Sequence, residues 1–262
     1  MRVETAMLPD AGSSQDRIFV TPSAVFMLDG ATAFVPVPVT PEQYVDTLGG
    51  HLVETLTTQP ATALSVALAD AIEQTARCLK LQIGKSPSST VAIVRQQGEI
   101  VDYLVLGDTQ IVTPAGIFVD NRIADVAITE RARYRDRLAT GGGYDQIHRG
   151  LLRDLQAKQA EHRNRDGGYW IAEADPRAAA EAATGWFVID SGRWAVLATD
   201  GAYRPMAHLV RDDWETIAYR SSDELKQTLA CLEGWEKHTD PDGIELPRAK
   251  RHDDKAIAAV RF

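Results

Sequence analysis

Cysteine and long apolar runs are both scarce in this sequence. Its only cysteines, Cys78 and Cys231, lie within predicted helices and outside any CxxC pattern, which argues against a disulfide framework and a thiolate zinc site. We therefore expect two free, buried thiols. The sequence has no apolar signal segment at its start and no run of about eighteen apolar residues. We expect a cytoplasmic protein with no membrane association.

Positive charge is also in deficit. The 262 residues carry 28 Lys and Arg against 37 Asp and Glu, a formal net charge of -9. This balance argues against nucleic acid or an anionic membrane surface as the main partner. The 44% hydrophobic content is that of an ordinary globular protein, and the length suffices for one domain with a large core.

Against these absences, one pattern recurs: an apolar run that meets an aspartate. The four acidic ends are Asp29-Gly30 after residues 25–28, Asp108 after residues 103–106, Asp200-Gly201 after residues 194–198, and Asp253-Asp254 before residues 256–260. Such runs predict buried strands. Carboxylates brought to one rim repel one another unless a cation lies between them, and a hard divalent ion is the usual solution. The alternative is that Asp-Gly is an ordinary turn dipeptide here.

The remaining patterns predict antiparallel sheets flanked by helices in a single domain over residues 1–262, an α+β fold. A hairpin of residues 18–20 with 25–30 would bring Asp16 and Asp29 to nearby strand ends. The other expected strands are residues 89–94, 100–106, 110–112, 117–119, 186–189 (turning at Ser191-Gly192), 194–198 and 256–262. Helices are expected over residues 41–57, from Pro60 to about residue 79, over 176–183 and around 214–235, and a polar loop over 237–252.

Residues 120–170 differ in kind from the rest. Arg131, Arg133, Arg135 and Arg137 alternate with small or polar residues, and Gly141-Gly142-Gly143 follows. Because few residues here would serve as core, we expect a mobile or partly exposed insertion, a flap over the pocket. The arginines would steer an anionic substrate or form a solvated helix face, and the glycines would form a flexible loop rather than a phosphate cradle.

Five short motifs, in this order and spacing, resemble those of the PPM (type 2C) metal-dependent Ser/Thr protein phosphatases, in particular bacterial members. The motifs are Gln15-Asp16-Arg17, Leu28-Asp29-Gly30, Leu106-Gly107-Asp108, Ala198-Thr199-Asp200-Gly201 and His252-Asp253-Asp254. The resemblance covers residues 15–260 and implies a four-layer α-β-β-α sandwich with a flap between the third and fourth motifs.

The resemblance also implies roles for these residues. Asp29 would bridge two Mn²⁺ or Mg²⁺ ions, and Gly30 would supply a backbone carbonyl. Asp200 and Asp253 would complete the shell of the first ion, Asp16 would hold metal-bound waters, and Asp108 would bind a weaker third ion. A hydroxide shared by the two ions would then attack phosphorus in a phosphoserine or phosphothreonine of a phosphoprotein substrate.

The sequence departs from the family where phosphate is handled. Gln15 replaces the usual Glu, Ala11 stands where many members have a phosphate-clamping Arg, Ala31 replaces a proposed proton donor, and Thr109-Gln110 replaces Ser-Arg. Arg17 or an arginine of the insertion would have to substitute for the clamp. Two further hypotheses stay open: a phosphatase-like binding or regulatory module with poor turnover, and a phosphatase of small phosphorylated metabolites.

Overall fold

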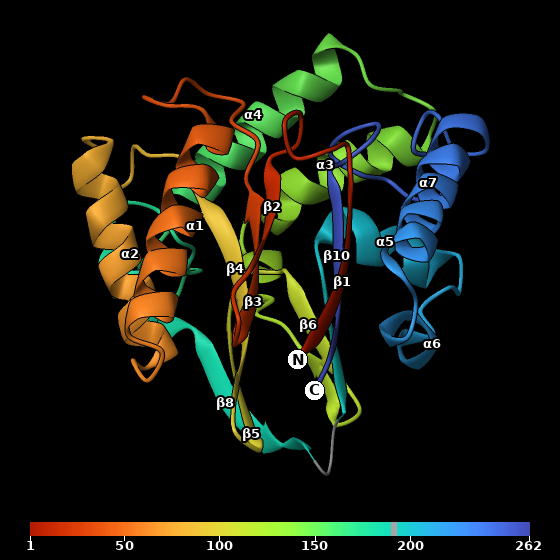
Figure 1. Ribbon diagram of the computed structural model, residues 1–262. Helices are drawn as coiled ribbons and strands as arrows, with labels where there is room; N and C mark the ends of the chain where they lie inside the picture. Colours follow the sequence, from red (N-terminus) through yellow and green to blue (C-terminus); the bar gives the residue numbers. More distant parts are fainter. Residues whose placement is uncertain (190–192) are drawn as a thin grey trace.

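Two five-stranded antiparallel sheets face each other in the computed structural model, which describes residues 1–189 and 193–262 (Figure 1). The expected turn at Ser191-Gly192 lies outside the described residues. The first sheet has the order β1 (Arg2–Leu8), β10 (Lys255–Arg261), β9 (Trp194–Ala198), β6 (Gln110–Thr113) and β7 (Gly116–Phe118). The second has the order β2 (Asp16–Val20), β3 (Ala24–Gly30), β4 (Ser89–Gln97), β5 (Ile100–Leu106) and β8 (Ala183–Val188).

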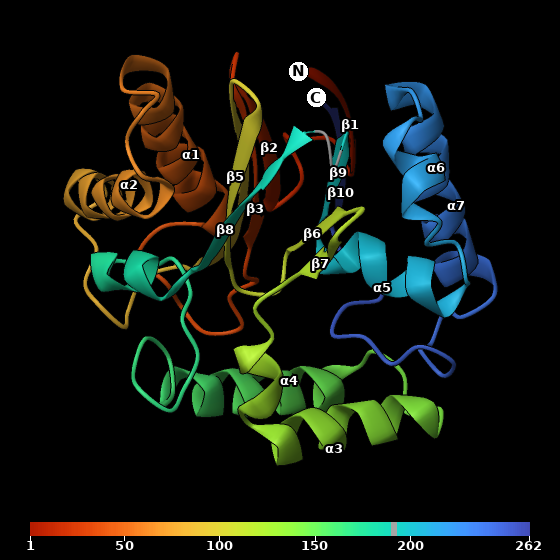
Figure 2. The same cartoon turned by 90° about the horizontal axis from the view of Figure 1, so that it is seen from below.

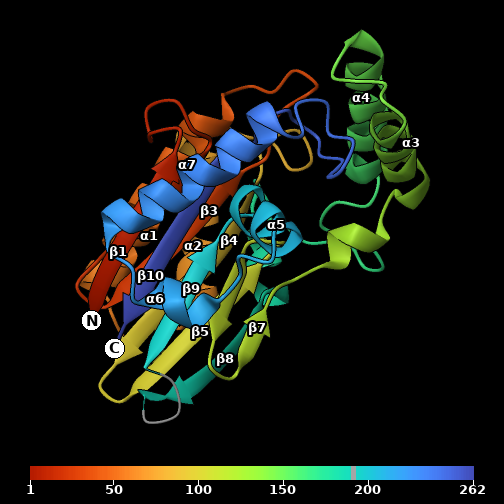
Figure 3. The same ribbon diagram turned by 90° about the vertical axis from the view of Figure 1, so that its right-hand side faces the viewer.

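Helices cover the outer face of each sheet, which confirms the predicted α-β-β-α sandwich (Figure 2). The second sheet carries α1 (Pro41–Thr58) and α2 (Leu64–Cys78), and the first carries α5 (Asp200–His208), α6 (Trp214–Ala218) and α7 (Ser222–His238). Two further helices, α3 (Ile128–Ala139) and α4 (Gln146–Ala160), pack on each other beyond one end of the sandwich (Figure 3). Short 3₁₀ turns lie at η1 (Arg122–Asp125) and η2 (Pro176–Glu181).

Strand alternation sorts the apolar residues into three layers. On β3, Val25 and Met27 join the apolar layer between the two sheets, whereas Phe26 and Leu28 face α1 and α2. Successive side chains of a strand point to opposite faces, so a continuous apolar run suits a strand that is covered on both sides. All four of these side chains are fully buried. This is why the predicted central strands read as unbroken apolar runs.

The start of α1 follows its sequence signals. Thr40 caps the helix by accepting a hydrogen bond from the Gln43 backbone N–H at 3.2 Å, and Pro41 takes the first helical position. The predicted apolar stripe, Tyr44, Leu48, Leu52 and Leu56, is buried against the second sheet. The prediction of this helix is confirmed.

Several expectations need correction. The helix expected over residues 176–183 is a 3₁₀ turn over Pro176–Glu181, and β8 begins at Ala183. Strand β1 was not predicted, although Val3 and Met7 alternate and pack between the sheets. Helix α5 was not predicted either, because its Asp200-Gly201 start reads as a turn. Cys78 and Cys231 are free, as expected, but exposed rather than buried, because both lie on solvent-facing positions of amphipathic helices.

The segment between β7 and β8 has more core than the sequence suggested. Helices α3 and α4 bury Tyr134, Leu138, Leu152 and Leu155 against each other. Arg133 and Arg135 are exposed, as expected of a solvated helix face. The expectation underestimated this core, because the apolar residues of α3 and α4 are few and widely spaced in a polar sequence yet lie on facing sides of the two helices.

Candidate active site

Acidic residues from both sheets meet at one end of the sandwich. Asp16 and Asp29 are paired residues of β2 and β3, as the hairpin prediction required. Thr199, between β9 and α5, donates from its hydroxyl to Asp16 Oδ2 at 2.9 Å and accepts from the Ala256 backbone N–H at 2.9 Å. This threonine ties the acidic end of the second sheet to two strands of the first.

The two Asp-Gly glycines are required by close backbone approach. A Cβ at Gly30 would lie 2.7 Å from the Gln15 carbonyl oxygen, and one at Gly201 would lie 1.9 Å from the Asp254 carbonyl oxygen. Neither glycine has the positive φ of many turn glycines. Gly30 ends β3 and Gly201 lies in the first turn of α5. The turn interpretation of these two pairs was therefore wrong: each glycine lets a neighbouring motif approach the aspartate before it.

One cavity of about 190 Å³ collects the five residues that the sequence analysis assigned to metal ions. It is lined by Asp29, Gly30, Asp108, Asp200 and Asp253, together with residues of α3 and α4. Asp16 lies behind this wall, with only 1% of its surface exposed. A larger cavity of about 530 Å³, between α5 and residues 246–249, shares Asp200 and Asp253 with the first. Asp200 and Asp253 thus lie between the two cavities and line both.

The carboxylates disfavour one another's ionisation. Burial, and then the neighbouring Asp16 and Asp200, raise the pKa of Asp29 well above its usual value. Burial raises the pKa of Asp200 to about 6, although Arg204 opposes the shift. Burial would also raise the pKa of Asp253, but Lys250 holds it below the ordinary range.

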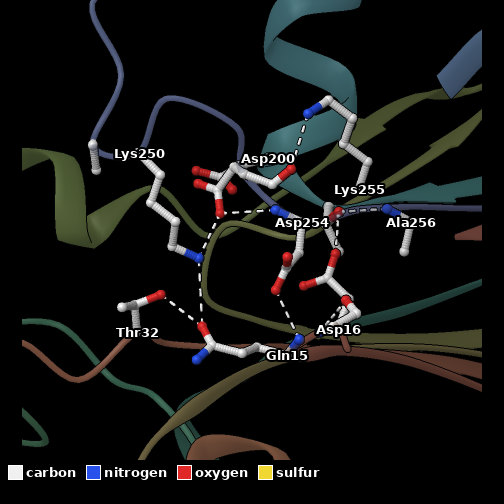
Figure 4. A network of polar contacts seen from close by, with 12 residues as sticks. Gln15, Asp16, Thr32, Asp200, Lys250, Asp254, Lys255 and Ala256 are labelled. Atoms are coloured by element: carbon white, nitrogen blue, oxygen red, sulfur yellow. Dashed lines mark hydrogen bonds and ion pairs between the residues drawn. The ribbon is translucent and has the colours of Figure 1, made fainter. Parts of the chain in front are cut away.

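Two cations of the chain already contact these acids. Arg204 on α5 pairs with Asp108 and with Asp200, each at 3.0 Å. Lys250 pairs with Asp253 at 2.7 Å and lies 3.4 Å from the Gln15 side-chain oxygen, which also accepts from the Thr32 hydroxyl (Figure 4).

The donor set suits a hard divalent cation in kind. Asp16, Asp29, Asp108, Asp200, Asp253 and Asp254 are six carboxylates against two contacting cations, an excess of four negative charges when all are ionised. Yet no three His, Cys, Asp or Glu side chains in residues 1–189 and 193–262 are arranged to hold an ion together. Three of these carboxylates instead form ion pairs within the chain: Asp108 and Asp200 pair with Arg204, and Asp253 pairs with Lys250. An ion would have to draw some of these carboxylates away.

The polar loop that leads to Asp253 was predicted from the sequence, but the role of Asp240 in holding it together was missed. Asp240, 2% exposed, accepts backbone N–H bonds from Ile244, Glu245 and Leu246, and its Oδ2 pairs with Arg248 at 2.7 Å. Burial alone would raise the pKa of Asp240, but these donors hold it below its ordinary value. An acid that precedes its donors by four to eight residues is a weak sequence signal for such a hydrogen-bond network in a polar loop. Only the structure therefore reveals Asp240 as the hub, the residue on which these bonds converge.

Arg17 does not replace the missing phosphate clamp. Its guanidinium pairs with Asp46 at 2.6 Å and donates to the backbone carbonyls of Ser14 and Asp16. Arg131, from the insertion, does line the acidic cavity. Its Nε is buried without a hydrogen-bond partner among the described residues, while its Nη2 donates to the Ile123 carbonyl. Of the substitutes considered from sequence, the insertion is the one that reaches the cavity.

Comparison with solved structures identifies the fold. The photosystem II phosphatase PBCP aligns with a TM-score of 0.56 and 11% identity over 99% of this chain and 98% of its own. The chain has the fold of the PPM-type serine/threonine phosphatases. The S. agalactiae serine/threonine phosphatase aligns with a TM-score of 0.54 and 14% identity over 98% of each chain.

A third phosphatase with this fold was solved with metal. The catalytic domain of PstP, in complex with two manganese ions, aligns with a TM-score of 0.50 and 12% identity over 98% of this chain and 96% of its own. No protein-family model and no curated protein matches the sequence. No helix of the described residues is long and apolar enough to cross a membrane.

Proposed function

We propose that this chain is a metal-dependent phosphomonoesterase that removes phosphate from phosphoserine or phosphothreonine in proteins. The observation that carries the proposal is the cavity lined by Asp29, Gly30, Asp108, Asp200 and Asp253, within a fold whose neighbours are serine/threonine phosphatases. Manganese or magnesium is the proposed cofactor, because one neighbour was solved with two manganese ions.

Each acid has a proposed task. Asp29, the Gly30 carbonyl, Asp200 and Asp253 would hold two ions, with Asp29 shared between them. Divalent ions at such a site lower the pKa of water and polarise phosphoryl oxygens. Asp16, hydrogen-bonded to Thr199, would orient a water beside Asp29. The excess negative charge of the site is what a pair of divalent ions would neutralise before a phosphate dianion could enter.

Positive side chains would guide the phosphate. Arg131, Arg204 and Lys250 all line the acidic cavity, and Arg131 has a donor without a partner among the described residues. These cations would bind the phosphate in place of the clamping arginine, because this chain has Ala11 at that position. Arg131 comes from the insertion, so the proposed flap would complete the site when α3 and α4 lie over it.

The test is hydrolysis of an aryl phosphate by the purified protein with Mn²⁺, with Mg²⁺ and with chelator. Turnover that is lost on chelation and restored by Mn²⁺ is expected. Hydrolysis of phosphopeptides in preference to phosphorylated metabolites would then assign the protein substrate. Absence of turnover with both metals, in protein that is folded and binds Mn²⁺ by calorimetry, would overturn the enzymatic proposal.

That negative outcome would favour the second candidate, a phosphatase-like binding or regulatory module. The observation in its favour is that Arg204 and Lys250 already occupy the carboxylates that an enzyme would offer to ions. The two candidates differ in turnover and not in fold. The aryl phosphate assay therefore discriminates between them.

A further inference from the structure

Arg204 lies between two acids that come from different sheets. Asp108 follows β5 of the second sheet, and Asp200 follows β9 of the first. Arg204, one turn after Asp200 on α5, places Nη2 3.0 Å from Asp108 Oδ2 and Nη1 3.0 Å from Asp200 Oδ2. The guanidinium therefore bridges the two carboxylates, and its own helix fixes its distance from one of them.

The charge of this bridge is permanent. A guanidinium stays protonated in proteins and presents its donors as a planar fork. A divalent ion at the same place would have to break both ion pairs and then lie against the displaced positive charge. An Arg at this position therefore excludes a cation between Asp108 and Asp200.

The other two cations that line the cavity form no ion pair with Asp108 or Asp200 among the described residues. Lys250 pairs with Asp253, and Arg131 donates to the Ile123 carbonyl. Asp29 and Asp16 are paired residues of β3 and β2, and neither has an ion pair among the described residues. Asp29 therefore has no cation of the chain beside its carboxylate, whereas Asp108 is already paired with Arg204.

We propose that Arg204 takes the place of a third divalent ion, so that the protein binds two ions and uses its own guanidinium between Asp108 and Asp200. This inference rests on the proposed metal-dependent function. It reassigns Asp108 from a ligand of a weak third ion to the partner of a built-in cation. Arg204 thereby acts as a positioning residue that holds Asp200 through Oδ2 and keeps a positive charge between the two cavities, both of which it lines.

The test counts bound Mn²⁺ in the full chain by calorimetry and by electron paramagnetic resonance of the free ion. We expect two ions for the wild type, three for Arg204→Gln, and two again for Arg204→Gln combined with Asp108→Asn. Arg211→Gln, at an exposed position beyond the end of α5, is the matched control and should bind two. Three ions in the wild type, or no added ion in Arg204→Gln, would overturn the inference while leaving the proposed function standing.

A second variant keeps the test decisive if Arg204→Gln fails to fold, as judged by circular dichroism and thermal melting. Asp108→Asn with Arg204 intact should leave the count at two and change each affinity less than about threefold. A fall from three ions to two in this variant would overturn the inference. A wild type that binds no Mn²⁺ at all would overturn the proposed function, and with it the inference.

Discussion

At the scale of single residues, the acids of the cavity are held in the folded state against their own repulsion. Asp200 shows this most directly, because burial raises its pKa to about 6 from an ordinary value of 3.8. A carboxyl whose pKa is raised on folding binds its proton more tightly in the native state. Its contribution to stability is therefore most favourable below about pH 4 and is lost as the pH rises through about 6.

Asp200→Asn should accordingly stabilise the metal-free protein at neutral pH. We expect the free energy of unfolding to rise by about 2 kcal/mol at pH 7 and to be unchanged at pH 4, since one pKa unit corresponds to about 1.4 kcal/mol and water screens part of the shift. Urea unfolding in chelator at both pH values measures this. The same variant should lose hydrolytic activity and bind Mn²⁺ more weakly.

Asp102→Asn is the control, because Asp102 pairs with Arg95 far from the cavity, on the β4–β5 hairpin. It should not reproduce the gain at pH 7. Equal effects of Asp200→Asn at pH 4 and pH 7 would contradict the raised pKa. Full activity in Asp200→Asn would remove this residue from the proposed site.

At the scale of elements, the α3–α4 pair is a separate small unit with its own apolar contacts. Leu138 is fully buried there, among Tyr134, Leu152 and Leu155. The pair also contacts the Asp253 loop, where His148 Nε2 lies 2.8 Å from the Ala249 carbonyl oxygen. A cluster this small gives the pair less stability than the sandwich has, so it should open before the sheets do.

Leu138→Ala should loosen this unit alone. Removing a buried leucine side chain costs about 2–5 kcal/mol, more than so few contacts are expected to supply. Amide hydrogen exchange should show lost protection over residues 128–160 and unchanged protection in β3, β4 and β10. A raised KM for phosphopeptide would place the pair over the substrate.

The matched control is Leu229→Ala on α7, which is equally buried but packs on the first sheet. This variant should lower the melting temperature of the whole protein without selective exchange in α3 and α4. If Leu138→Ala instead lowers protection throughout the sandwich, the pair is an integral part of the core and not a flap.

At the scale of the whole molecule, the acidic end joins two sheets that otherwise meet through apolar contacts. Asp29 belongs to the second sheet, whereas Asp200 and Asp253 follow or precede strands of the first. A ligand that binds all three would connect the sheets in the folded state only. Its binding energy would therefore add to the stability of the whole fold.

Mn²⁺ should raise the melting temperature. At about 100 times its dissociation constant, one ion stabilises by about 2.7 kcal/mol, which corresponds to an increase of about 5–10 °C for a protein of this size. Scanning calorimetry with Mn²⁺, and with Mn²⁺ plus excess chelator, measures the shift. An equal ionic strength of KCl should produce little of it, and no shift with Mn²⁺ would contradict a site between the sheets.

The sequence by itself determined the layers of this protein. The unbroken apolar runs of β3, β4, β9 and β10 require cover on both faces, and the amphipathic stripes of α1, α2 and α7 supply it. The recurrence of an aspartate at the end of a buried strand also suggested one acidic rim, although spacing alone did not show that these ends would meet. These are local or periodic properties, and residue spacing encodes them.

Only the tertiary structure decided what the acids contact. The Arg204–Asp108 pair and the Lys250–Gln15 contact join residues that are far apart in the sequence and meet only at the end of the sandwich. The same holds for the need for glycine at Gly30 and Gly201, because at each position the backbone of another motif leaves no room for a Cβ. Strand β1 belongs to this class as well, since it is completed by pairing with β10 at the other end of the chain. Long-range contacts of this kind carry no period along the sequence, so no spacing rule reveals them.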